Sequence, residues 1–215
     1  MNPSPSQGRR VWPVGRPPLL LLALAALLLP APGAAQLLPG EDLGFPMRGG
    51  FGWAGTLPDA LLGAAGFYMF QGNRWGIYVD AKIPHDSPKR NPNFQDNLTI
   101  AQVESEFPAD RRIPIFVVEE WRLFNVAFIR PVTEESAIVL GGGVAHFSAV
   151  QEYGDEGEMP LTRSGFYFVE DELRSGWEPN LLVSAMFRGG TSVAFNAGFE
   201  WAPKSFTFAL LYIFQ

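Results

Sequence analysis

The sequence predicts an all-β protein, an eight-stranded antiparallel up-and-down transmembrane β-barrel. Three observations predict it: segments in which bulky apolar and smaller side chains alternate, short turn sequences between these segments, and little charge. Of the 215 residues, 47% are hydrophobic, 13% aromatic and only 18% charged. Alternation with a period of two is the signature of a β-strand. The charged share is below that of ordinary soluble domains, which leaves few side chains for a water-facing surface.

The first 35 residues have the pattern of a secretory signal peptide. Three arginines and no acidic residue precede an apolar run at 19–29, and small residues follow up to Ala35. This run is shorter than the roughly 20 apolar residues that a membrane-spanning helix needs. We therefore expect 1–35 to be removed by cleavage after Ala35. A short periplasmic segment, 36–46, would then precede the barrel at 47–215.

The strands are clearest at the C-terminal end, where bulky apolar residues occupy every second position. These residues are Phe206, Phe208, Leu210, Tyr212 and Phe214. The same alternation, interrupted by turns that contain glycine, proline or asparagine, continues toward the N-terminus. It predicts eight strands, at 47–56, 61–71, 74–83, 119–131, 136–151, 178–188, 191–202 and 204–214. A second count, left open at this point, omits 47–56 and takes 164–172 as a strand.

One face of each predicted strand is bulky and the other is small. The small face carries mainly Thr, Ala, Gly, Ser and Asn, which make a poor water-facing surface but fit the interior of a narrow barrel. The bulky face suits lipid, and a β-structure that spans a bilayer must close on itself. Isolated polar residues then lie inside the barrel: Asp80, Lys82, Arg122, Asn196 and Glu200. Because buried charges need partners, we expect these residues to form a network that plugs the lumen.

Connection lengths support the first strand count. With the N-terminus in the periplasm, three connections lie on the periplasmic side of the membrane and are short: 72–73, 132–135 and 189–190. The two long connections, 84–118 and 152–177, both lie on the cell-exterior side of the membrane. Short periplasmic turns and long outer loops are typical of outer-membrane barrels.

This pattern resembles the small eight-stranded bacterial outer-membrane barrels of the outer-membrane protein X, protein W and protein A membrane-domain type. The resemblance covers 47–215. The alternation at 206–214 is similar to the C-terminal insertion signal that the barrel assembly machinery recognises, although Gln215 follows the final aromatic residue. The resemblance implies an outer-membrane location and contact with outer-membrane lipid and lipopolysaccharide. We expect a monomer with a structural or surface-binding role, or, as a variant, a small-solute pore.

One pair of residues suggests an enzyme. His146 and Ser148 share a strand face, and an activated serine needs a neighbouring base. The pair is similar to the His-x-Ser of the outer-membrane lipid A deacylases, but Ala149 stands where that family has Asn. The sequence assigns no carboxylate as a third member. The alternatives are a lipid A-modifying hydrolase and a polar pair where a strand leaves the membrane.

Composition excludes other classes. The absence of cysteine excludes a disulfide scaffold and a cysteine-ligated metal, and we expect no cofactor or metal. A net charge of −6 argues against nucleic-acid binding. A soluble periplasmic carrier of the lipocalin type remains a third alternative. It would direct Phe195 inward and Asn196 outward, whereas a membrane barrel requires the reverse.

Overall fold

The computed structural model describes residues 45–70, 74–158 and 160–214. Its strands are β1 (Gly49–Leu57), β2 (Leu61–Phe70), β3 (Trp75–Pro84), β4 (Ile113–Pro131), β5 (Ser136–Gly154), β6 (Phe166–Arg188), β7 (Val193–Glu200) and β8 (Ser205–Phe214). Between β3 and β4 lie the helices η2 (Pro88–Arg90), α2 (Ile100–Glu106) and η3 (Ala109–Arg111). The predicted signal peptide and most of segment 36–46 lie outside the described residues. No helix in the described ranges is long and apolar enough to cross a membrane.

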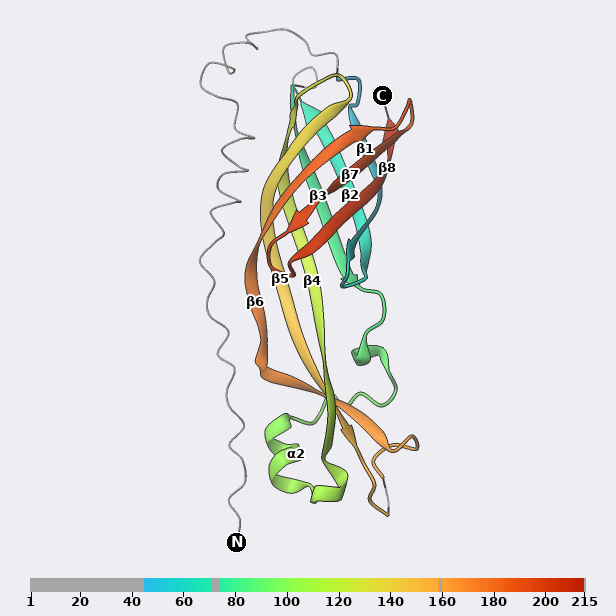
Figure 1. The fold of residues 1–215 in the computed structure, drawn as a ribbon, viewed down its shortest axis with the longest axis vertical. Helices are drawn as coiled ribbons and strands as arrows, with labels where there is room; N and C mark the ends of the chain where they lie inside the picture. The colour runs from blue at the N-terminus through green and yellow to red at the C-terminus, as the bar shows by residue number, and fades with distance from the viewer. Residues whose placement is uncertain (1–44, 71–73, 159, 215) are drawn as a thin grey trace. The chain divides into compact units, whose positions relative to one another are not determined.

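The eight strands form a closed antiparallel barrel in which each strand pairs with the next one along the chain. The barrel closes where β1 pairs with β8, from Gly49 opposite Phe214 to Leu57 opposite Phe206 (Figure 1). At this closure the backbones approach closely, since a Cβ on Gly52 would collide with the carbonyl group of Leu210. Closure leaves no unpaired strand edge in the barrel wall, and it confirms the predicted fold class.

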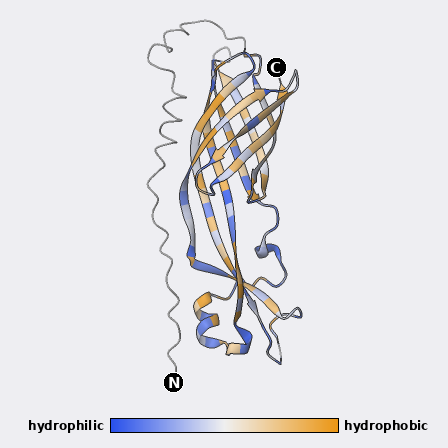
Figure 2. Cartoon of the chain, in the orientation of Figure 1, coloured by the Kyte–Doolittle hydropathy of each residue, from blue (hydrophilic) through white to orange (hydrophobic). Residues whose placement is uncertain are grey.

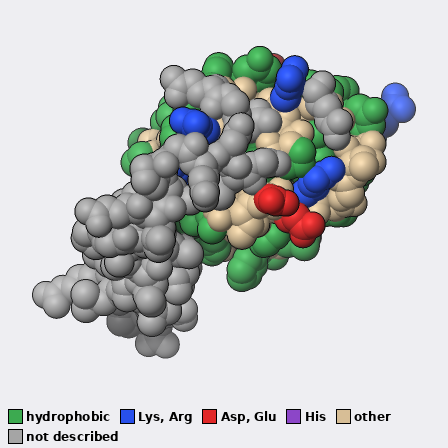
Figure 3. Space-filling view, turned by 90° about the horizontal axis from the view of Figure 1, so that it is seen from above, with side chains coloured by type: hydrophobic (Ala, Val, Ile, Leu, Met, Phe, Trp, Pro, Cys, Tyr) green, Lys and Arg blue, Asp and Glu red, His purple; other side chains and the backbone are tan. Residues whose placement is uncertain are grey.

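The bulky faces point outward. Tyr212 is 59% exposed, whereas its neighbour Leu211 is fully buried, and all ten residues of β8 alternate in this way. Phe195 is exposed, and Asn196 is buried. Apolar residues follow the barrel strands in Figure 2, and Figure 3 shows apolar side chains around the perimeter, viewed from the end with the short turns. This arrangement matches a lipid-facing wall and is the reverse of the one that the soluble carrier requires.

Three strands are longer than the sequence predicts. β4, β5 and β6 have 19, 19 and 23 residues and continue beyond the barrel, where they pair with one another and with none of the other five strands (Figure 1). We call this part, with the connections that cover it, the outer extension. The predicted outer connections 84–118 and 152–177 are therefore too long, since parts of both are strand. The two strand counts are also resolved, because 47–56 is mostly β1 and 164–172 mostly belongs to β6.

The reason for this error lies in two irregularities. The β4–β5 register shifts between Pro114 and Val117, and the β5–β6 register shifts between Phe147 and Ala149. A bulge moves the following side chains to the opposite face. The alternation that reveals a strand in the sequence therefore stops at each shift, although the backbone pairing continues.

A charge at the middle of the outer wall is expected to destabilise the barrel. Leu210 is exposed near the middle of β8, opposite Trp53. In lipid vesicles, Leu210→Arg should lower the free energy of unfolding by about 2–4 kcal/mol, because it places a cation in hydrocarbon. Urea titration followed by tryptophan fluorescence measures the change. The matched control is Ile115→Arg, at an exposed apolar position of the outer extension. Equal destabilisation by both variants would contradict a lipid-facing wall.

Candidate functional site

A charged cluster crosses the barrel interior. Lys82 Nζ lies 2.7 Å from Asp80 Oδ2 and 2.6 Å from Glu200 Oε1, and all three side chains are fully buried. Asn125 Nδ2 donates to Asp80 Oδ1 at 2.8 Å and to Glu200 Oε1 at 2.9 Å. Asn180 extends the network by donating to Asn125 Oδ1 at 2.8 Å. Because β3 and β7 are not neighbours, these bonds tie one wall of the barrel to another.

The sequence predicted three members of this cluster inside the barrel, Asp80, Lys82 and Glu200, together with the nearby strand residue Asn196. Asp80, Lys82, Asn196 and Glu200 are buried, on the side of their strands that faces the interior. The sequence reasoning missed Asn125 and Asn180. Asn125 could have been found from its strand alternation, since it lies between the buried residues Leu123 and Ala127.

The expectation for Arg122 is wrong. Its side chain is 40% exposed, and it lies two residues from the outward-facing Phe124 and opposite His146 on β5. Its nearest acidic partner is Glu120, at 3.8 Å. β4 pairs with β3 only as far as Leu123, so at Arg122 the strand is leaving the barrel and its half-exposed side chain is not enclosed by the barrel wall. Because its side chain is half exposed, Arg122 needs no carboxylate inside the barrel to pair with its charge.

Buried apolar side chains flank the charged cluster on both sides inside the barrel. Toward the short turns lies a large buried group that includes Met47, Phe67, Met69, Tyr78, Ile129, Val139, Met186 and Ile213. Toward the outer extension, Leu61, Leu123 and Ala145 are buried, and Trp121 and Ala202 pack against them. The charged cluster therefore lies between two apolar layers.

In the outer extension, α2 packs on one face of β5 and β6. Val103 of α2 is buried against Tyr153, Tyr167 and Val169. The two tyrosine rings stack with centroids 5.5 Å apart, and Tyr167 donates its hydroxyl to the carbonyl oxygen of Arg111 at 2.7 Å. Burial, with the charge of Asp155 as a second cause, raises the pKa of Tyr167 to about 12. The helix begins at Thr99, the N-cap of a capping box.

The connection after β3 covers the other face. Its backbone joins the edge of β6, with Gln95 N donating to Phe168 O at 2.9 Å and Phe168 N donating to Asn93 O at 3.1 Å. Lys89 Nζ lies 2.6 Å from Glu170 Oε1 and donates to Ser148 Oγ at 3.1 Å. These contacts cover a strand edge that would otherwise be unpaired.

The turn between β5 and β6 is organised by Asp155. Its carboxylate accepts bonds from Leu161 N at 2.7 Å and Gly157 N at 3.2 Å, and it pairs with Arg111 Nε at 3.2 Å. Burial favours the neutral carboxyl group, but these donors outweigh it and lower the pKa of Asp155. At Glu170, burial likewise favours the neutral carboxyl group, but the hydrogen bond and charge of Lys89 outweigh burial and lower the pKa of Glu170.

The predicted pair His146 and Ser148 does share a face. Ser148 Oγ lies 3.4 Å from His146 Nδ1, and two carboxylates that the sequence could not assign are near it: Glu120 opposite Ser148 on β4, and Glu170. However, Ser148 is 1% exposed and its oxygen accepts a bond from Lys89. A serine nucleophile needs an open approach and an available base. In this arrangement the serine instead holds the covering connection in place.

The closed barrel and its outward apolar wall define the class: a small eight-stranded β-barrel of the outer-membrane type. No family model matches the chain, and no curated protein is a significant match. Among solved structures, the chain is similar to Ail, the attachment invasion locus protein of Yersinia pestis. The likeness has 11% identity and a TM-score of 0.40 over 77% of this chain and 96% of Ail. For Ail in complex with the heparin analogue sucrose octasulfate, the values are 13% and 0.42 over the same shares.

Removing the cation from the interior cluster should be strongly destabilising. Lys82→Met leaves the carboxylates of Asp80 and Glu200 buried without their shared partner, which should cost about 3–5 kcal/mol of unfolding free energy. Urea titration in lipid vesicles measures this loss. The control, Lys82→Met combined with Asp80→Asn and Glu200→Gln, should recover most of the stability. Failure of the neutral triple variant to recover stability would show that charge balance is not what the cluster provides.

Acid should loosen the outer extension before the barrel. Because the pKa values of Asp155 and Glu170 are lowered on folding, their stabilisation is complete above the ordinary carboxyl pKa of about 4. It is lost as the pH falls through the lowered values. Hydrogen exchange, corrected for its intrinsic pH dependence, should show the Leu161 amide deprotected in acid while β8 amides stay protected. Asp155→Asn should remove most of this pH dependence, and earlier deprotection of β8 would contradict the prediction.

Proposed function

We propose that this protein is an outer-membrane surface protein whose outer extension binds a partner at the cell exterior and whose barrel is a closed anchor. In this proposal the leader 1–35 directs export and is cleaved after Ala35. The alternating residues at 206–214 serve the assembly machinery as an insertion signal. The mature protein is a monomer without catalytic activity.

The observation that carries the proposal is the outer extension. Three strands project from the barrel, and β5 and β6 are covered by α2 on one face and by the connection after β3 on the other, which fixes this surface. β3 pairs with β4 only from Lys82 opposite Leu123 to Gly76 opposite Ile129, so the outer part of β4 has β5 on one side and no other named strand on the other. Apolar residues are exposed in this part, among them Ile115 and Phe116. An exposed strand edge with apolar side chains favours partner binding.

The filled interior supports an anchor and not a pore. The charged cluster lies between two apolar layers, and an eight-stranded barrel is just wide enough for its own side chains to fill. The hydrolase alternative is weaker, because Ser148 is buried beneath Lys89.

Cysteine labelling on intact cells tests the orientation. The chain contains no cysteine, so a single introduced thiol reports one position. Arg163→Cys, in the exposed connection between β5 and β6, should react with a membrane-impermeant maleimide on intact cells. Glu134→Cys, in the exposed turn between β4 and β5, is the matched control and should react only after the cells are opened. The reverse pattern would overturn the proposed orientation.

Planar-bilayer recording tests the closed lumen. The purified full-length chain should give no conductance steps, because apolar layers close the interior on both sides of the charged cluster. Regular steps from the heat-modifiable, folded form would contradict the anchor and support the pore variant.

A further inference from the structure

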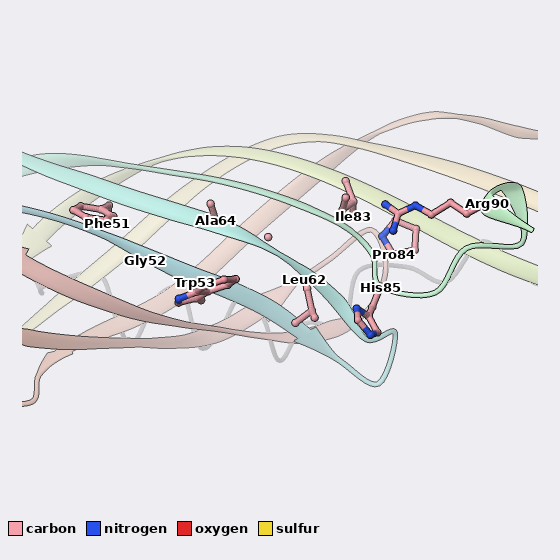
Figure 4. Close-up of a pocket in the computed structure, with 10 residues that line it drawn as sticks. Phe51, Gly52, Trp53, Leu62, Ala64, Ile83, Pro84, His85 and Arg90 are labelled. Atoms are coloured by element: carbon pink, nitrogen blue, oxygen red, sulfur yellow. The ribbon is translucent and has the colours of Figure 1, made fainter.

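A groove on the outer wall was not anticipated from the sequence. It has a volume of about 580 Å³ and crosses β1, β2 and β3 on the side that faces lipid (Figure 4). Phe51, Trp53, Leu62 and Ile83 contribute large apolar side chains to its lining. Such a volume is in the range of small-molecule binding sites.

The hollow arises where small residues meet in adjacent strands. Ala64 lies between Trp53 on β1 and Ala81 on β3, and the lining also includes Gly52 and Gly63. The exposed side chains of Trp53 and Leu62 therefore form the sides of the groove, and small residues form its base. In a membrane this hollow cannot stay empty and takes up apolar material, of which acyl chains are the local source.

The outer end of the groove is polar and cationic. His85 and Arg90 line it, and both are exposed. Figure 4 shows Arg90 reaching back from η2 toward Pro84. Within the described ranges no ion pair involves Arg90, and no carboxylate lines the groove. The backbone beneath it is fixed, because Arg90 N donates to Ser87 O at 2.9 Å and the neighbouring Lys89 is held by Glu170.

We propose that this groove binds an acylated, phosphorylated lipid of the outer leaflet, the lipid A part of lipopolysaccharide. One acyl chain lies along Trp53, Leu62 and Ala64, and a phosphate contacts Arg90, with His85 as a second donor. A guanidinium group binds phosphate in a bidentate manner, which favours a phosphorylated headgroup over a neutral one. The inference rests on the proposed function in one respect: the end with His85 and Arg90 must face the outer leaflet.

Native mass spectrometry of the full-length barrel tests the site. The probes are lipid A, lipid A without its phosphates, and phosphatidylglycerol. The wild-type chain should bind lipid A at least tenfold more tightly than either other probe. Arg90→Gln should weaken lipid A binding about tenfold, because it removes a charge-assisted bond. Ala64→Phe should weaken it similarly by filling the hollow.

Matched variants separate this site from general lipid contact. Arg130→Gln removes an exposed arginine near the opposite end of the barrel, and Ala197→Phe enlarges an exposed alanine on β7. Both should leave lipid A binding unchanged, and all four variants should keep heat-modifiable gel migration. The inference is overturned if Arg90→Gln and Ala64→Phe bind lipid A like the wild type, or if phosphatidylglycerol or the phosphate-free lipid binds equally well. Cysteine labelling tests the orientation independently, so the two failures are distinguishable.

Discussion

The structure depends on one constraint: within hydrocarbon, every backbone N–H and C=O group must find its partner inside the protein. An unpaired group in lipid costs several kcal/mol, and only a closed sheet avoids it when strands cross the bilayer. The pairing of β1 with β8 meets this requirement. Once the sheet closes, each strand has one face toward lipid and one toward the interior. Residues at alternate positions therefore meet different environments, which explains the alternation of bulky apolar and smaller side chains along each strand.

Closure with only eight strands leaves an interior that side chains must fill. This explains why the inward faces carry small residues at many positions and a few large ones that interlock. It also explains how the chain can hold Lys82 between two buried carboxylates, because the barrel walls place Asp80 and Glu200 within bonding distance of its ammonium group. The cluster links β3 to β7 across the barrel.

Beyond the barrel, backbone groups can also pair with water, so a closed sheet is no longer required. β4, β5 and β6 continue without the other five strands, so their edges and faces need other cover. Covering segments supply it: α2 packs near Tyr153 and Tyr167, and the connection after β3 joins the edge of β6. Charged pairs such as Lys89 with Glu170 hold this cover in place. The parts of the molecule available to a partner are the ones that this cover leaves open.

The groove on the lipid-facing wall joins an apolar part of the barrel to a charged residue of the connection after β3. On the barrel wall, the small Ala64 lies between larger neighbours and leaves a hollow, and beyond the end of β3 Arg90 adds a charge. Neither feature is unusual alone. Their alignment in one groove arises because β1, β2 and β3 are hydrogen-bonded neighbours whose outer ends lead into the same connection.

Local alternation was enough to predict eight strands, a closed fold and the direction of most strand faces, because period-two patterning reports the two environments of a membrane strand directly. It placed Phe195 outside and Asn196 inside, as the structure has them. It did not reveal the length of β4 to β6, because register shifts interrupt the pattern while pairing continues. It misplaced Arg122, and it did not pair Lys89 with Glu170 or align Trp53, Ala64 and Arg90. Those relations join residues far apart in the chain, and only the register of the closed sheet brings them together.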